Sequence, residues 1–141
     1  MKRAHELSAE QRARLESWAA RRGFRLVVLF GSRARGEARP DSDFDVAVWP
    51  SRQEKPLERL TWVCELEDII GGEAQLAIVR EIDPVLGWEI GRDGKPWVEA
   101  EEGIWARERL RLWHLYNDSL PFRRLLRRQL ADFAAEVRRG A

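Results

Sequence analysis

The chain has 141 residues, of which 44% are hydrophobic and 35% charged, and its formal net charge is +1. This composition excludes an intrinsically disordered polymer, and the length favours one domain with a real hydrophobic core. No stretch approaches the roughly 18 apolar residues needed to span a membrane. The segment Met1 to Gln11 has no apolar core of the kind found in signal peptides. These features together predict a cytoplasmic protein.

Cys64 is the only cysteine, which excludes an internal disulfide, and His5 and His114 are too few to complete a zinc site with it. We expect Cys64 to lie in the core. Arginine supplies 22 of the 25 basic residues. That preference fits either phosphate recognition, for which the guanidinium group is well shaped, or a composition bias unrelated to function.

The first half of the chain predicts one helix followed by two strands. Ser8 to Arg22 should be helical, because Ser8 and Gln11 can form a capping box and Gly23 is a stop signal. The apolar run Phe24 to Phe30 predicts a buried strand, and the alternating run Asp43 to Trp49 predicts a second, closed by Pro50. On this second strand the alternation predicts Phe44, Val46 and Val48 on one face and Asp43, Asp45 and Ala47 on the other.

The second half predicts a third strand and four helices. A helix over 56–70 should bury Leu57, Leu60, Val63 and Cys64, and Glu73 to Val79 should follow as a strand. Asp83-Pro84 predicts the start of a short helix with Val85, Leu86 and Ile90 inward, before a possible edge strand over 94–98. Two helices, over about 103–117 and after Pro121, should end the chain. This order predicts a single α/β (α+β) domain over 1–141, with a small mixed sheet in a core at about 8–98 and a helical extension at about 103–139.

A glycine-serine pair at the end of one strand and a carboxylate pair on the next carry the chemistry. Gly31 has no Cβ, so phosphate can approach its backbone, and Ser32 adds a hydroxyl donor. Asp43 and Asp45 project from the same face of a strand, about 6.6–6.8 Å apart along the chain. Two such carboxylates suit Mg²⁺, which often takes one or two protein carboxylates together with substrate phosphates. Each half alone is an ordinary turn or solvated strand, and only their combination indicates a site.

Two other nucleotide-binding motifs are excluded by the residues present. Gly31 and Gly36 have the spacing of a P-loop, but Glu37 and Ala38 stand where that loop requires Lys and Ser or Thr. A Gly-x-Gly-x-x-Gly fingerprint is absent from the sequence, so a Rossmann dinucleotide site has no support.

The segment Gly31-Ser32-Arg33-Ala34-Arg35-Gly36, followed by Ser42-Asp43-Phe44-Asp45, resembles the Gly-Ser-x10-Asp-x-Asp signature of minimal nucleotidyltransferases in the DNA polymerase β-like superfamily. The resemblance spans residues 24 to about 98. Small members of this size resemble MntA-type antitoxins of HEPN/MNT toxin–antitoxin modules. The resemblance therefore implies transfer of AMP from ATP, with Mg²⁺ or Mn²⁺, to a tyrosine of a HEPN ribonuclease toxin encoded nearby.

Carried over by position, the resemblance implies that Gly31 and Ser32 bind phosphate and that Asp43 and Asp45 bind metal. Arg35 could neutralise triphosphate charge, whereas Arg33 is expected to be a surface residue. The third carboxylate of the superfamily is replaced here by Gln75, which cannot accept a proton. Glu73 could stand in for it only if the register is shifted by two residues.

The last helix is basic, with six arginines and two carboxylates after residue 119. We expect its apolar stripe (Phe122, Leu125, Leu126, Gln129, Leu130, Phe133 and Val137) to pack on the domain, leaving Arg123, Arg124, Arg127 and Arg128 in solvent. Docking of an acidic partner is an alternative, and nucleic acid is a weaker one. Seven tryptophans also suggest a protein interface, as a homo- or hetero-oligomer, with Trp105 and Trp113 as candidates.

These motifs are compatible with three functions. The leading one is Mg²⁺-dependent nucleotidyl transfer to a partner toxin, with Asp43, Asp45 and Gln75 at the catalytic centre. The second is an antitoxin that neutralises its toxin by binding alone, which the presence of Gln75 favours. The third is a small-molecule transferase resembling aminoglycoside nucleotidyltransferases, for which 141 residues leave little room.

Overall fold

The computed structural model describes residues 6–140. His5, considered above for a zinc site, and the start of the segment Met1 to Gln11 lie outside the described residues. Within 6–140, no helix is both long enough and apolar enough to cross a membrane.

Four strands form one mixed sheet, as the sequence predicts. They are β1 (Phe24–Phe30), β2 (Phe44–Pro50), β3 (Ala74–Ile78) and β4 (Lys95–Glu99), in the order β3-β2-β1-β4. β1 pairs antiparallel with β2 and with β4, while β2 pairs parallel with β3. β2 therefore lies between the strand that precedes Gly31 and the strand that carries Gln75.

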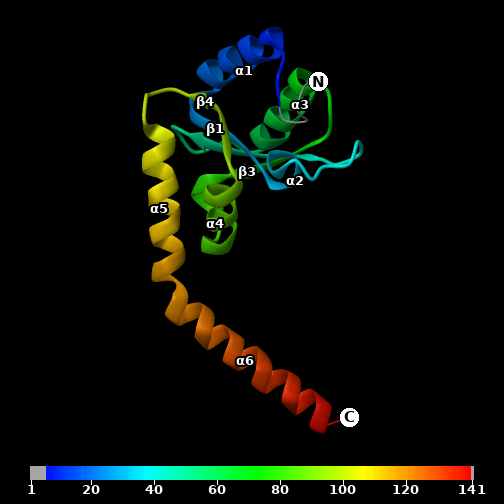
Figure 1. The fold of residues 1–141 in the computed structure, drawn as a ribbon, viewed down its shortest axis with the longest axis vertical. Coiled ribbons are helices and arrows are strands. Elements are labelled where there is room, and N and C mark those ends of the chain that lie inside the picture. Colours follow the sequence, from blue (N-terminus) through cyan, green and yellow to red (C-terminus); the bar gives the residue numbers. More distant parts are fainter. Residues whose placement is uncertain (1–5, 141) are drawn as a thin grey trace.

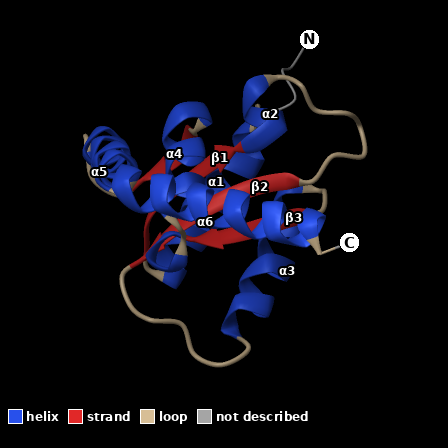
Figure 2. Cartoon of the chain, turned by 90° about the horizontal axis from the view of Figure 1, so that it is seen from below, coloured by secondary structure: helices blue, strands red, loops and turns tan. Residues whose placement is uncertain are grey.

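Helices cover the two faces of this sheet unequally. On one face, α1 (Ala9–Arg22) and α3 (Glu58–Ile70) cover a cluster that includes Val46 and Val48. On the other, α4 (Pro84–Asp93) and α5 (Ile104–Asp118) pack against Ala47 and Trp49 through Ile90, Ile104 and Leu112. Figures 1 and 2 show this layering. Asp45 follows the alternation of Ala47 and lies on the second face, where the helical cover is incomplete.

The remaining helices are short or peripheral. α2 (Gly31–Arg35) is a single turn directly after β1, and a 3-10 turn (Val79–Glu81) follows β3. α6 (Leu120–Arg139) ends the chain and extends away from the sheet (Figure 1).

Local signals set two helix starts as predicted. The Ser8 side chain accepts the backbone N–H of Gln11, and the Gln11 side chain accepts that of Ser8, which completes the capping box of α1. The Asp83 carboxylate accepts the backbone N–H of Leu86, with Pro84 in the first turn of α4. These caps satisfy backbone donors that the first turn leaves unpaired.

The predicted inner face of α3 is wrong except at Val63, which is partly buried and packs against the core. Leu57 and Leu60 are 82% and 64% exposed, and Cys64 is also exposed rather than in the core. The buried residues of α3 are Trp62, Leu66, Ile69 and Ile70. α3 has apolar residues on both sides, and the side with Trp62 and two isoleucines removes more apolar surface from water. In α4, likewise, Ile90 is buried but Val85 is 45% exposed.

The core buries more of the seven tryptophans than the sequence led us to expect. Trp18, Trp49, Trp62 and Trp97 are buried. Trp105 is partly buried and packs edge-on to Trp49, with ring centroids 6.2 Å apart. Of the two interface candidates, Trp105 and Trp113, only Trp113 is exposed, at 52%.

The predicted packing of the last helix is also wrong. No side chain of α6 is buried, and its apolar stripe faces solvent along its whole length. Within residues 6–140, α6 is held at its first turn, where Arg123 donates to Ser119 and to the Tyr116 carbonyl of α5.

Candidate active site

The site begins where β1 gives way to α2. Phe30 pairs with Asp45 across β1 and β2, so Gly31 lies beside the Asp45 side chain. Gly31 has φ +73°, in the left-handed region, and a Cβ built there would overlap the Asp45 carboxylate. Both the backbone conformation and the close approach therefore require glycine. This contact joins the two halves of the predicted motif.

The parallel pairing of β2 and β3 places Gln75 directly beside Asp45. The Gln75 Nε2 donates a hydrogen bond of 3.1 Å to Asp43 Oδ2. Gln75 thus occupies the position where sequence reasoning placed it, next to both carboxylates. The two-residue shift that would substitute Glu73 does not occur, because Phe44 pairs with Ala74 and Phe44 N–H donates to the Glu73 carbonyl.

Arg33 braces the loop that carries Asp43, so the expectation of a simple surface residue is wrong. Its Nε and Nη2 donate to the Ser42 carbonyl oxygen at 3.0 and 2.7 Å. Its guanidinium also lies 4.0 Å from the centre of the Phe44 ring. These contacts hold the Ser42 carbonyl and the Phe44 ring, which belong to the two residues flanking Asp43.

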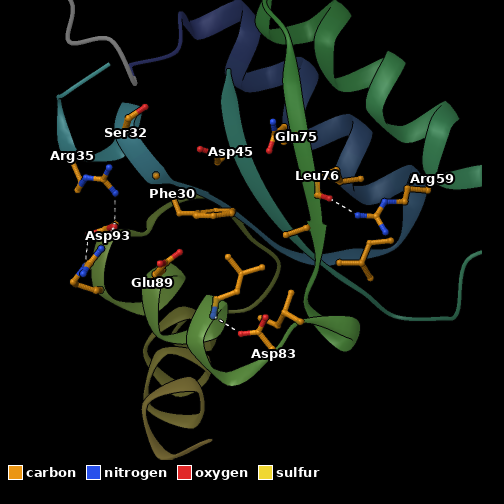
Figure 3. Close-up of a pocket in the computed structure, with 16 residues that line it drawn as sticks. Phe30, Ser32, Arg35, Asp45, Arg59, Gln75, Leu76, Asp83, Glu89 and Asp93 are labelled. Carbon is orange, nitrogen blue, oxygen red and sulfur yellow. Dashed lines mark hydrogen bonds and ion pairs between the residues drawn. The ribbon is translucent and has the colours of Figure 1, made fainter. Parts of the chain in front are cut away.

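A cleft of about 860 Å³ opens over this part of the sheet. Gly31, Ser32, Arg35, Asp45 and Gln75 line one side of it. Figure 3 shows how the side chains of the last four lie. Within the described chain, the Ser32 hydroxyl has no hydrogen-bond partner. Asp43 does not line the cleft directly but is joined to it through Gln75.

The opposite wall of the cleft comes from α4, and sequence reasoning missed it. Glu89, Arg92 and Asp93 line the cleft from this helix, and Figure 3 shows the side chains of Glu89 and Asp93. Leu86, Glu89 and Asp93 are spaced i, i+3, i+7, so they share one helical face. That spacing was the available signal, since Leu86 was already assigned to the inner face. Arg59 of α3 also lines the cleft and donates to the Leu76 carbonyl at 2.7 Å.

Arg35 connects the two walls of the cleft. Its Nη1 pairs with Asp93 Oδ2 at 2.9 Å, and its Nε pairs with Glu37 at the same distance. Hydrogen bonds from Arg92 and Arg35 outweigh partial burial and lower the pKa of Asp93. Arg35 is therefore placed beside the cleft but is already neutralised by two carboxylates.

Asp45 is the carboxylate of the site whose protonation is perturbed. Burial, with smaller contributions from the negative charges of Asp43 and Glu89, raises its pKa, and Arg35 partly opposes this. An ionised Asp45 is consequently short of a compensating positive charge. Among residues 6–140, no group of three or more His, Cys, Asp or Glu side chains is arranged to hold a metal. The two carboxylates that the motif brings to this part of the sheet are those of Asp43 and Asp45, joined through Gln75.

The chain belongs to the polymerase beta nucleotidyltransferase family, whose sequence model matches residues 16–102. No curated protein sequence matches the chain.

Three solved structures illustrate the likeness. A toxin–antitoxin structure with AMP-PNP has a TM-score of 0.73 at 17% identity, covering 85% of this chain and 98% of that one. A tri-AMPylated HEPN toxin in complex with its MNT antitoxin, from Shewanella oneidensis, has a TM-score of 0.68 at 15% identity, covering 86% and 96%. A protein provisionally described as a minimal nucleotidyltransferase has 35% identity and a TM-score of 0.53, covering 62% and 89%. These likenesses agree with the predicted nucleotidyltransferase fold.

Proposed function

We propose that this protein transfers AMP from ATP to a hydroxyl group, most simply that of a tyrosine, on a HEPN-family toxin, and thereby acts as its antitoxin. Family membership supports nucleotidyl transfer, and similar folds occur in a toxin–antitoxin structure with AMP-PNP and in a complex with an AMPylated HEPN toxin. The observation that carries the proposal is the contact of Gly31 with Asp45, which joins the two halves of the motif at one cleft.

Gly31 and Ser32 would bind the β- and γ-phosphates of the nucleotide. The absent Cβ of Gly31 leaves its backbone open to a large anion, and the unpartnered Ser32 hydroxyl can donate to a phosphate oxygen. Arg35 would reinforce this binding if phosphate displaced Glu37, the more exposed of its two carboxylate partners. Arg59 and Arg92 add positive charge along the same cleft.

Asp43 and Asp45 fit a divalent cation. Burial and the neighbouring Asp43 make the ionised form of Asp45 unfavourable without a positive charge, which Mg²⁺ or Mn²⁺ would supply. Two carboxylates and phosphate oxygens are a usual ligand set for Mg²⁺. When bound, such an ion would stabilise negative charge on the triphosphate during in-line displacement.

The acceptor hydroxyl must lose a proton as its oxygen forms a bond to the α-phosphorus and the bond to pyrophosphate breaks. Gln75 cannot take this proton, because its amide is neutral and donates to Asp43. Glu89 lines the cleft and has no hydrogen bond or ion pair with any other described residue. Asp93 is held by arginines and Asp83 caps α4, so Glu89 is the cleft carboxylate best placed to accept the proton.

A second candidate function is neutralisation of the toxin by binding alone. The hydrogen bond from Gln75 to Asp43 favours it, because it occupies one oxygen of a carboxylate that would otherwise face a cation. In this alternative the cleft binds nucleotide weakly or not at all, and the antitoxin effect does not depend on Asp43.

The experiment combines the purified chain with Mg²⁺, ATP labelled with ³²P at the α-phosphate, and its proposed partner, a HEPN-family protein. We expect the label on the HEPN-family protein, loss of labelling with Asp43→Asn, and loss of toxin control in cells carrying that variant. Equal labelling by Asp43→Asn would refute the mechanism. Absent labelling with full toxin control by both forms would establish the binding-only alternative.

A further inference from the structure

α6 has an apolar stripe that no described part of the chain covers. Six of its side chains are between 44% and 67% exposed: Phe122, Leu125, Leu126, Leu130, Phe133 and Val137. They recur at helical spacing from Phe122 to Val137, over about 24 Å of the 20-residue helix. A contiguous apolar surface of this kind marks an interaction site.

The first turn of α6 is fastened to the rest of the protein. Arg123 donates to the Tyr116 carbonyl and the Ser119 hydroxyl, both at 2.9 Å, and its guanidinium lies 3.8 Å from the centre of the Tyr116 ring. The Tyr116 ring stacks on Trp88, with centroids 5.2 Å apart, and Arg92 lies 4.4 Å from the Trp88 ring centre. Because Arg92 also lines the candidate active cleft, the first turn of α6 is connected to that cleft through Tyr116 and Trp88, while the rest of the helix extends away from the sheet.

The charges around the stripe identify the chemistry of what covers it. α6 has six arginines and two carboxylates, a net charge of +4. By helical geometry, Arg123 and Arg127 border one edge of the stripe, and Asp132 and Glu136 border the other. A second copy of α6 would bring two net charges of +4 together. An anionic membrane or a nucleic acid would attract the arginines but would repel Asp132 and Glu136, which border the stripe itself.

We propose that the α6 stripe is the docking surface for the acceptor protein. That protein would present an apolar helix face or groove with a net negative border, whose carboxylates lie opposite Arg123 and Arg127. Apolar side chains would supply most of the affinity and the charged edges would set the register. The identity of the acceptor as a HEPN-family toxin rests on the function proposed above, whereas the docking surface rests on α6 itself.

The test measures binding of the 141-residue chain to its proposed HEPN-family partner by isothermal titration calorimetry. Leu126→Glu/Phe133→Glu places charges within the stripe, and we expect at least about a tenfold loss of affinity. Ala131→Glu/Arg124→Ala changes the net charge by the same amount on the opposite face, and should bind within about threefold of wild type. Leu126→Ala/Phe133→Ala should weaken binding in the same direction as the charged pair. All these side chains are exposed, so the thermal midpoints should match that of wild type.

Three results would overturn the proposal. One is equal binding by wild type and the Leu126→Glu/Phe133→Glu variant. Another is equal loss in the stripe and opposite-face variants, which would indicate net charge alone. The third is unchanged partner binding while the stripe variant loses either adsorption to phosphatidylserine vesicles or self-association by light scattering, since α6 would then serve a membrane or a second copy.

Binding and transfer are scored separately, so the two proposals can fail independently. Asp45→Asn should bind the HEPN-family protein like wild type but transfer no label. The stripe variant should require more partner for half-maximal labelling, with little change in the rate at saturating partner. Binding without any transfer would refute the proposed chemistry and leave the docking surface intact.

Discussion

The sheet with its packed helices and the helix α6 have the same kind of periodic apolar pattern, but the apolar face is buried in the first region and exposed in the second. In the core, Leu15, Leu26 and Leu66 are fully buried, and the alternation of β2 separates an apolar face from the face that carries Asp45. In α6, apolar residues at equally regular spacing are all exposed. Periodicity therefore predicts a helix and its apolar face, but it does not tell whether that face is covered by the same chain or by another molecule.

The largest difference between the two regions should appear in stability. Phe24 is 3% exposed and packs edge-on to Trp18 and Trp62, whereas Phe133 is 65% exposed. Phe24→Ala should lower the free energy of unfolding by about 3–5 kcal/mol. Phe133→Ala should change it by less than about 0.5 kcal/mol. Urea denaturation measures both, and a cost above about 2 kcal/mol for Phe133→Ala would mean that α6 is part of the core.

Alanine variants of two glycines with the same backbone conformation distinguish the effect of backbone strain from that of a clash with Asp45. Gly31 and Gly36 have φ +73° and +75°, but only a Cβ at Gly31 meets another atom, the Asp45 carboxylate. Gly31→Ala should reduce labelling of the partner at least about a hundredfold, because it displaces Asp45. Gly36→Ala should keep most of the activity. Comparable rates for the two variants would show that the contact of Gly31 with Asp45 has no functional role.

Removing the Glu89 carboxylate, and then adding a carboxylate at position 75, tests which residue accepts the proton. Glu89→Gln should slow transfer by about 10²-fold, the lower end for loss of a positioned base. Adding Gln75→Glu should restore part of the rate, because it returns a carboxylate to the position beside Asp45. Glu73→Gln, outside the cleft and just before the same strand, is the control and should change little. Wild-type rates for Glu89→Gln would remove this residue from the mechanism.

Arg33→Lys should have a smaller, selective effect. Lysine keeps the charge but cannot reproduce both hydrogen bonds to the Ser42 carbonyl or the stacking on Phe44. We expect about a tenfold higher Mg²⁺ requirement for transfer, with a nearly normal rate at saturating Mg²⁺, because the loop holding Asp43 is less well fixed. A fall in the saturated rate with an unchanged Mg²⁺ requirement would contradict this role.

The smallest predicted effect is a pH-dependent gain of stability in Asp45→Asn. The pKa of Asp45 is raised in the folded protein, so the folded state binds its proton more tightly than the unfolded state. Stability therefore falls as pH rises from the unfolded to the folded pKa of this group. Without metal, Asp45→Asn should raise the thermal midpoint by a few degrees at pH 7, and this gain should shrink at acidic pH. A lower midpoint than wild type at pH 7 would argue against a destabilising carboxylate.

The sequence was most informative where local rules decide the structure. Caps at Ser8 and Asp83, strand alternation on β2 and the glycine at position 31 all led to correct elements. It also placed Gln75 on the strand next to Asp45, and the pairing of β2 with β3 confirms that position. These features depend on residues close in the chain or on one strand pairing.

The failures share a physical cause, since they depend on competition between faces or on contacts across the cleft. α3 has apolar residues on two sides, so its buried face is decided by the larger area around Trp62. Arg33 was misjudged because its carbonyl partner follows nine residues later. Glu89 and Asp93 were missed because no strand pairing links α4 to the motif, although their spacing with Leu86 contained the signal.

The central claim is that Asp43 and Asp45 hold a divalent cation together with a triphosphate bound at Gly31 and Ser32. Titration of AMP-PNP into the protein, with and without Mn²⁺, tests it most directly. We predict that Mn²⁺ strengthens nucleotide binding to wild type by at least about tenfold and has no such effect on Asp43→Asn/Asp45→Asn. The same Mn²⁺-dependent gain in both proteins would contradict the claim.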